Sequence, residues 1–274
     1  MRNTETKRSG AWQALASHWP EYLIEAALLA CFMLSACAFT VLLEHPSSPL
    51  HRSIDNPLVR RMLMGLAMGA TLIAIVYSPP GRRSGAHLNP YLTLTYFMLG
   101  KIARWDAIFY ACSQLVGGAL GVFIASLLIG APVSQDAVNY AVTIPGSGGA
   151  WVAFAAEIMI STLMILTVLT ASNTKSLSRF TGLIAGALVA VFITVEAPLS
   201  GMSMNPARTL GSALFAGEWR SIWVYFTAPL IAMVAGGQLF RLRKGPHAVL
   251  CAKLHHHNTT QCIFRCNYGA INGN

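Results

Sequence analysis

Six long stretches of this 274-residue chain contain no Asp, Glu, Lys or Arg, and these stretches strongly limit what it can fold into. They are residues 26–43, 62–81, 107–135, 158–174, 180–195 and 221–240. A helix that crosses the hydrocarbon core of a bilayer needs about 20 mostly apolar residues. The sequence therefore predicts an all-α membrane protein with six transmembrane helices, near 22–43, 58–78, 105–130, 151–171, 181–197 and 222–241.

The composition excludes other classes of protein. Charged residues make up 11% of the chain, whereas an ordinary soluble domain has about 25%. Hydrophobic residues make up 54%, which excludes intrinsic disorder. The net charge of +9 comes mostly from short segments between the apolar stretches, so we expect a lipid bilayer rather than nucleic acid as the surroundings of the chain.

The basic residues also predict an orientation. With the N-terminus inside, 14 of the 19 Lys and Arg residues fall on the inner side of the membrane. Cytoplasmic segments carry an excess of these residues. We therefore expect a cytoplasmic N-terminal segment at 1–20, a membrane domain at 21–243 and a cytoplasmic tail at 244–274, in a plasma membrane or a bacterial inner membrane.

Two segments between the apolar stretches are too polar to span a bilayer, and they resemble each other. Residues 84–94 and 200–210 share Ser-Gly, Asn-Pro and Thr-Leu in one register, 116 residues apart. Each follows the second of the three spans in its half. Because three is an odd number, the second half must cross the membrane in the opposite direction to the first. The two halves (about 21–130 and 151–243) therefore form an inverted repeat. Asn-Pro starts a helix well. We expect two re-entrant half-helices, which run from Tyr91 to Gly100 and from Ala207 to Gly217 and meet at the membrane midplane.

At these residues the chain resembles the aquaporin family, the major intrinsic proteins. The resemblance extends over about residues 20–243 and rests on Asn89-Pro90-Tyr91, Asn205-Pro206-Ala207-Arg208, Glu25, Glu157, Gln114-x-x-Gly117 and Pro229. It implies six spans with two half-helices, and a homotetramer with one pore per subunit. It also implies a passive channel that excludes protons and ions.

The resemblance assigns roles to individual residues. The amides of Asn89 and Asn205, each followed by the first proline of a half-helix (Pro90, Pro206), would donate hydrogen bonds to a permeating oxygen. Arg208 would be a fixed cation near the outer mouth. Glu25 and Glu157 would satisfy buried groups of the re-entrant loops, although a proton relay is an alternative. His87 would either face the inner vestibule or pack within its loop.

The expected selectivity filter consists of Met68, Ile193, Met202 and Arg208. A slip of one residue would replace Ile193 by Phe192 or Thr194. Water-selective members of the family carry His at the Ile193 position and an aromatic residue at the Met68 position. This apolar filter instead predicts permeation by water and by small neutral solutes such as glycerol.

Other positions depart from the family pattern. Glycerol facilitators carry an acid and a basic residue where this chain has Thr209 and Ala213, whereas Tyr225 and Phe226 are aromatic as in water channels.

Tyr91 replaces the small residue that usually follows the first Asn-Pro. It would either pack sideways or narrow the pore.

The tail contains residue types that bind metals. Cys251, His255, Cys262 and Cys266 form a possible ligand set. Their spacing is not that of a standard zinc finger, so a plain tail is the alternative, and no cofactor is expected.

Two rival functions remain open. Inverted repeats also build secondary transporters, in which Glu25, Glu157 and Glu196 would be coupling acids. A membrane metalloprotein would instead use the tail. No pair of acid and base or activated nucleophile indicates an enzyme.

Overall fold

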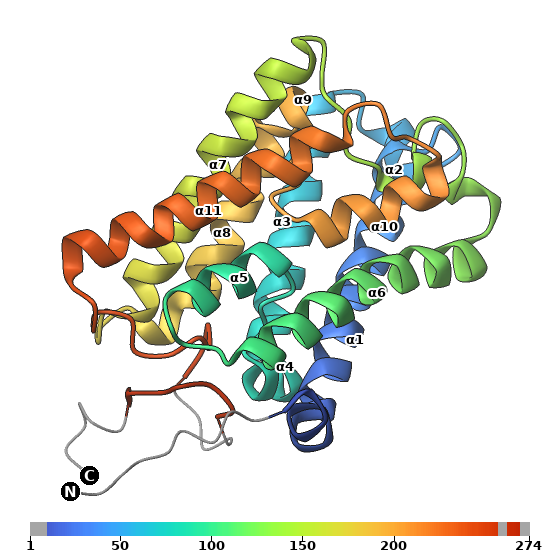
Figure 1. Ribbon diagram of the computed structural model, residues 1–274. Coiled ribbons are helices and arrows are strands. Elements are labelled where there is room, and N and C mark those ends of the chain that lie inside the picture. The colour runs from blue at the N-terminus through green and yellow to red at the C-terminus, as the bar shows by residue number, and fades with distance from the viewer. Residues whose placement is uncertain (1–9, 257–261, 269–274) are drawn as a thin grey trace, which may run out of the picture.

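The computed structural model describes residues 10–256 and 262–268 and is shown in Figure 1. Within these residues, six helices are long and apolar enough to cross a membrane, as the sequence predicts. They are α1 (Ala11–Glu44), α3 (Pro57–Tyr77), α6 (Arg104–Ile129), α7 (Gly149–Ser172), α8 (Thr181–Val195) together with the turn before it, and α11 (Ile222–Lys244). The fifth span reaches its length only with that turn and runs over Ser178–Val195. Their outward faces carry large exposed side chains such as Leu66, Leu127 and Leu128, which suits a hydrocarbon solvent.

The helix contacts confirm the inverted repeat. Helix α1 packs along α6, and the equivalent α7 packs along α11. The half-helix α5 (Pro90–Met98) packs on α11, and the half-helix α10 (Pro206–Ala216) packs on α6. Each half-helix therefore rests on the last helix of the opposite half, and Figure 1 shows both between the long helices.

Both half-helices begin as the sequence predicts. Asn89 and Asn205 are the N-caps, and each side chain accepts a hydrogen bond from the backbone two residues later. Helix α10 crosses α6 so closely that a Cβ atom at Gly118 would collide with the carbonyl oxygen of Ala207. Glycine at this position therefore lets α10 lie at membrane depth.

Short helices connect the spans. Two of them, α4 (Pro79–Ser84) and α9 (Ala197–Ser200), occupy equivalent places in the repeat and lead into the re-entrant loops. The others are α2 (Pro49–Ser53) and the 3₁₀ turns η1 (Ala131–Val133), η2 (Asn139–Ala141) and η3 (Ser178–Phe180).

The first helix is longer than the sequence predicts, because it begins at Ala11 rather than near residue 22. Its first turns carry polar side chains that have partners on neighbouring elements. His18 lies 2.8 Å from the carboxylate of Asp106, and Arg83 donates a 2.8 Å hydrogen bond to Glu21. A helix can continue past the membrane boundary where its charged side chains are paired. A charge-free stretch therefore locates the apolar core of a span but not the residue at which the helix begins.

Candidate functional site

The two re-entrant loops border one cavity of about 440 Å³ between the helices. At one end, which we call the far mouth, its lining includes Thr40, Glu44, Pro57 and Arg61. At the other end, the tail-side mouth, the lining includes Ala86, His87 and Leu254 of the C-terminal tail. Helices α1, α3, α7, α8 and α11 all contribute side chains between these ends.

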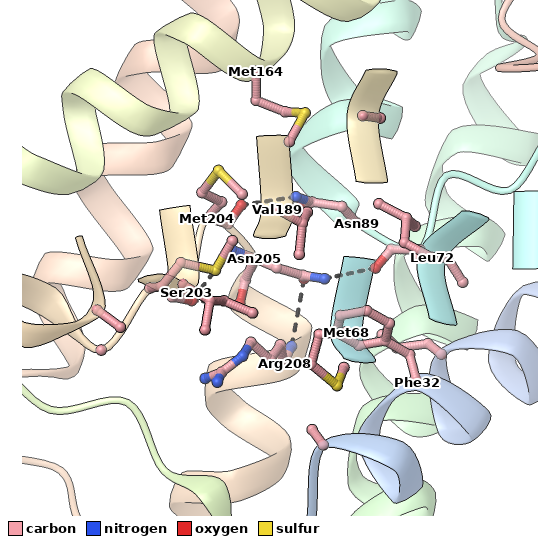
Figure 2. Close-up of a pocket in the computed structure, with 18 of the residues that line it drawn as sticks. Phe32, Met68, Leu72, Asn89, Met164, Val189, Ser203, Met204, Asn205 and Arg208 are labelled. Carbon is pink, nitrogen blue, oxygen red and sulfur yellow. Dashed lines mark hydrogen bonds between the residues drawn. The ribbon is translucent and has the colours of Figure 1, made fainter. Parts of the chain in front are cut away.

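Asn89 and Asn205 approach each other across this cavity from opposite sides (Figure 2). The amide nitrogen of Asn89 donates to the carbonyl oxygen of Met204 at 2.7 Å, and that of Asn205 donates to the carbonyl oxygen of Leu88 at 2.7 Å. A carboxamide nitrogen carries two hydrogens. The second N–H of Asn89 contacts only the sulfur of Met233, a weak acceptor, at 3.9 Å. The second N–H of Asn205 remains for a molecule in the cavity.

The loops that hold these asparagines have an unusual backbone. Ala86 and Leu88 in the first loop both have φ 55°, and Met202 and Met204 in the second both have φ 52°. Residues other than glycine rarely adopt such left-handed conformations, which cost about 1–3 kcal/mol each. Both loops therefore need strong anchors to keep this shape.

Glu25 anchors the first loop. Its carboxylate accepts hydrogen bonds from the Ser84 hydroxyl (2.7 Å), the His87 backbone (3.1 Å) and the Leu88 backbone (2.8 Å). The Gln114 side chain donates a fourth, at 2.8 Å. The carboxylate of Glu25 is fully buried and lies outside the cavity lining.

Glu157 anchors the second loop in the equivalent way. It accepts hydrogen bonds from the Ser200 hydroxyl (2.8 Å), the Ser203 backbone (2.7 Å) and the Met204 backbone (2.8 Å). It is also fully buried and outside the cavity lining. The geometry at both acids is that of loop support.

The structure brings the four expected filter residues to the same cavity. Met68, Ile193, Met202 and Arg208 all line it, with Arg208 one turn beyond Asn205 in α10. Within the described residues, Nη1 of Arg208 is buried and has no hydrogen-bond partner. One unpaired cationic donor therefore stands among three apolar side chains.

Tyr91 packs sideways. Its hydroxyl donates to the carbonyl oxygen of Phe226 in α11 at 2.8 Å, and Tyr91 is not part of the cavity lining. The two amide hydrogen bonds of Asn89 and Asn205 keep the loops in contact. The large side chain at this position thus leaves the centre of the cavity open.

His87 both lines the cavity and packs tightly. Its Nε2 donates to the carbonyl oxygen of Ala252 at 2.8 Å, and its Nδ1 lies 3.0 Å from the Thr93 hydroxyl. Its ring stacks on Phe264, with centroids 5.3 Å apart. Both ring nitrogens are thus engaged, and one partner belongs to the tail.

The tail brings three cysteines together with a different histidine from the one expected. The ligand atoms of Cys251, His256, Cys262 and Cys266 all lie within 4.8 Å of one another. His255 instead packs edge-on against Tyr77, with ring centroids 4.9 Å apart. Successive residues of an extended segment point in different directions, and the sequence does not show which one faces the sulfurs.

Two buried lysines accompany these cysteines. Burial lowers the pKa of both Lys101 and Lys253, and the nearby cysteine sulfurs act in the opposite direction. The side chains of Cys251 and Lys253 are each about 2% exposed, so this part of the tail is packed rather than solvated.

Several lining residues escape sequence reasoning. Arg61 and Glu44 bring charge to the far mouth, and Leu254 brings a tail residue to the other end. Only the Arg60-Arg61 pair before the second apolar stretch could have indicated a charged mouth.

Beyond Met68 and Met202, four more methionines line the cavity, namely Met64, Met164, Met204 and Met233.

Comparison with known proteins adds to this geometry. The family described as "Major intrinsic protein" matches residues 14–240. Aquaporin NIP6-1 of Arabidopsis thaliana is 33% identical over 186 residues, and Aquaporin NIP2-3 of Zea mays is 28% identical over 200 residues. The matches include 67% and 73% of this chain but only 59% and 64% of those proteins, so the chain spans less than two thirds of their length. The aquaglyceroporin from Plasmodium falciparum has a similar fold, with a TM-score of 0.66 and 18% identity over 82% of this chain and 96% of that one.

Proposed function

Because the chain belongs to the major intrinsic protein family, we propose that it is a passive transmembrane channel for water and small neutral solutes such as glycerol. One observation carries the proposal. The side-chain amides of Asn89 and Asn205 each use one N–H to join the loops, and their second N–H groups, that of Asn89 held only by the weak acceptor Sδ of Met233, lie in one cavity that is lined by all the long helices except α6. The named relatives are aquaporins rather than enzymes.

The asparagines would orient each permeating water molecule. Its oxygen would accept hydrogen bonds from the second N–H groups of Asn89 and Asn205, in place of the weak Asn89–Met233 contact. Its own hydrogens would then point away toward the neighbouring molecules. The N-termini of α5 and α10, which carry partial positive charge, lie at the same place. A proton would lose its hydrogen-bonded path here and meet positive potential, as in aquaporin-type pores generally.

The filter would admit small polyols as well as water. Met68, Ile193 and Met202 offer apolar surface to carbon atoms, and Arg208 offers a hydrogen bond to a hydroxyl group. Water finds a single strong donor at this point. We therefore propose that the filter passes glycerol measurably.

The secondary-transporter alternative is less well supported. Such a transporter needs an acid that changes its protonation while in contact with the solute. Glu25, Glu157 and Glu196 all lie outside the cavity lining, and the first two are saturated by loop donors. Glu44 does line the cavity, at the far mouth, but its carboxylate is paired with Arg60 at 3.2 Å.

We further propose a setting for the channel. The basic segments around Arg82–Arg83 and Lys101–Arg104 lie beside the tail, which bonds to Gly85 and Lys101, and Arg83 also bonds to Glu21 in the first part of α1. Their basic charge supports a cytoplasmic location for both termini. A plasma membrane or a bacterial inner membrane fits this orientation. Membership of the family supports a homotetramer with one pore per subunit.

Stopped-flow light scattering tests the function. Proteoliposomes that contain the wild-type chain or Leu254→Ala are exposed to water and glycerol gradients, beside empty liposomes. We expect faster shrinkage and measurable glycerol entry in at least one of the two samples, linear in solute concentration and unchanged by a proton gradient. Rates equal to those of empty liposomes in both would overturn the channel. Saturable flux that follows the proton gradient would support the transporter.

A further inference from the structure

The four tail side chains that converge have the chemistry of a metal site. Cys251 and His256 come from one stretch of the tail, and Cys262 and Cys266 come from another. The sulfurs of Cys251 and Cys262 are 3.5 Å apart, and the sulfur of Cys266 lies 2.9 Å from Nε2 of His256. Three thiols and one imidazole are a standard ligand set for structural zinc.

The distances suit a tetrahedral ion. With Zn–S near 2.3 Å and Zn–N near 2.0–2.1 Å, the ligand atoms of such a site are about 3.5–3.8 Å apart. The four atoms here, all within 4.8 Å of one another, need to move by only about an ångström to meet those distances. A disulfide would use two of the three sulfurs and leave the third sulfur and the histidine without a role.

The charges around the cluster are also suitable. Three thiolates and one neutral imidazole give a zinc centre with a net charge of −1. Lys253 is buried two residues after Cys251, and the carbonyl oxygen of the buried Lys101 accepts a hydrogen bond from the backbone of Arg265, which precedes Cys266. A buried negative centre is stable only beside such positive groups.

The tail that carries these ligands is tied to the channel at several points. The backbone N–H of Leu254 donates to the carbonyl oxygen of Gly85 at 3.2 Å, and that of Arg265 donates to the carbonyl oxygen of Lys101 at 2.9 Å. On the other half of the repeat, the Tyr268 hydroxyl donates to the carbonyl oxygen of Ser172 at 2.9 Å. The tail therefore bridges the two halves across one end of the bundle (Figure 1).

Two tail residues lie at the tail-side mouth. Leu254 lines the cavity itself. Phe264 stacks on His87, and one of its ring carbons would lie 2.9 Å from a Cβ atom at Gly85, whose φ is 99°. His87 lines the cavity where the tail contacts it, and it is 3% exposed. At the far mouth, within the part of the chain that the structure describes, the Glu44 side chain is 35% exposed.

We propose that Cys251, His256, Cys262 and Cys266 bind one Zn²⁺ ion, and that the zinc-bound tail is a plug that closes the tail-side mouth of the pore. The plug rests on the proposed channel function, whereas the zinc site does not. Zinc joins the stretch that holds Leu254 to the stretch that holds Phe264. Loss of the metal releases both side chains from the mouth.

Metal content tests the zinc site on the full-length chain purified in detergent under reducing conditions. We expect about one zinc ion per chain after metal-free dialysis, and loss of most of it in Cys262→Ser and His256→Gln. The matched controls Cys112→Ser and His247→Gln, which lie outside the cluster, keep the zinc. Cobalt exchanged into the site gives the visible absorption of a tetrahedral thiolate complex. Zinc content in the wild type no higher than in Cys262→Ser, or a Cys251–Cys262 disulfide in place of the metal, would overturn the site.

Water flux tests the plug with the same proteins in liposomes. We expect a several-fold faster shrinkage of wild-type proteoliposomes after treatment with a membrane-permeant zinc chelator, and no effect of the chelator on Cys262→Ser, which is already open. Leu254→Ala keeps its zinc and is open without the chelator. Fast shrinkage that is the same in all samples refutes the plug and leaves the channel. Bound zinc with shrinkage at the empty-liposome rate in every sample supports the metal site and refutes the channel together with its plug.

Discussion

The substitution Glu157→Leu removes the anchor of the second re-entrant loop. Glu157 is fully buried and accepts three hydrogen bonds, from the hydroxyl of Ser200 and the backbone N–H groups of Ser203 and Met204. Leucine is similar in size and accepts none. The three donors stay buried because the surrounding helices keep water out.

The expected cost follows from this count. A buried donor without a partner costs about 1–3 kcal/mol, so three of them cost about 3–9 kcal/mol. Typical folded proteins have only about 5–15 kcal/mol of net stability. The loop also holds Met202 and Met204 in strained conformations that need this anchor. We therefore expect a large loss of stability, with most of the protein misfolded or absent from the membrane.

Thermal unfolding in detergent, followed by the loss of the monodisperse size-exclusion peak, measures the effect. Glu157→Gln is an intermediate case, because one oxygen can still accept from Ser200 and Ser203 while Met204 loses its acceptor. Glu218→Leu, which removes an ion pair and a backbone hydrogen bond with the exposed Arg220, is the matched control and should unfold like the wild type.

Two results would refute this reasoning. An unfolding temperature of Glu157→Leu within a few degrees of the wild type would show that the carboxylate does not hold the loop. Normal stability with the loss of a gradient-dependent flux would instead make Glu157 a coupling acid of a transporter.

Three further variants test other parts of the site. Asn205→Asp replaces an amide donor by an anion beside two helix N-termini, so water flux should fall and cation exclusion should weaken; unchanged flux and no proton leak at equal abundance would contradict this. The double change Ile193→His and Met202→His makes the filter narrower and more polar, so stopped-flow measurements should show a larger loss of glycerol flux than of water flux. Tyr91→Phe removes only the hydrogen bond to the Phe226 carbonyl, so it should lower stability by about 0.5–1.5 kcal/mol and leave water flux unchanged; a change in flux would place Tyr91 at the pore.

Much of the fold could be predicted because the membrane leaves few options. Absence of charge locates the spans, and the repeated Asn-Pro segments locate the half-helices. These features depend on residue type and spacing, which a sequence displays directly. The loop-support role of the two acids Glu25 and Glu157 is implied instead by the resemblance to the aquaporin family, and the structure gives each of them loop donors.

What could not be predicted depends on partners that are distant in the sequence. The early start of α1 depends on Arg83 and Asp106, which are paired with Glu21 and His18. The direction of Tyr91 depends on a carbonyl oxygen of α11. The position of the tail over the pore depends on backbone hydrogen bonds to Gly85 and Lys101, which leave no trace in composition or periodicity.

The central claim is that water crosses the membrane through the cavity between Asn89 and Asn205. Val189 lines that cavity beside the two asparagines (Figure 2), and Val189→Trp would fill it. The direct measurement is the osmotic shrinkage rate of chelator-treated proteoliposomes that contain equal amounts of wild type or Val189→Trp, each confirmed as folded by size exclusion. The account predicts that the wild type shrinks faster than empty liposomes and that Val189→Trp falls to the empty-liposome rate. Equal rates for the folded variant and the wild type would contradict it.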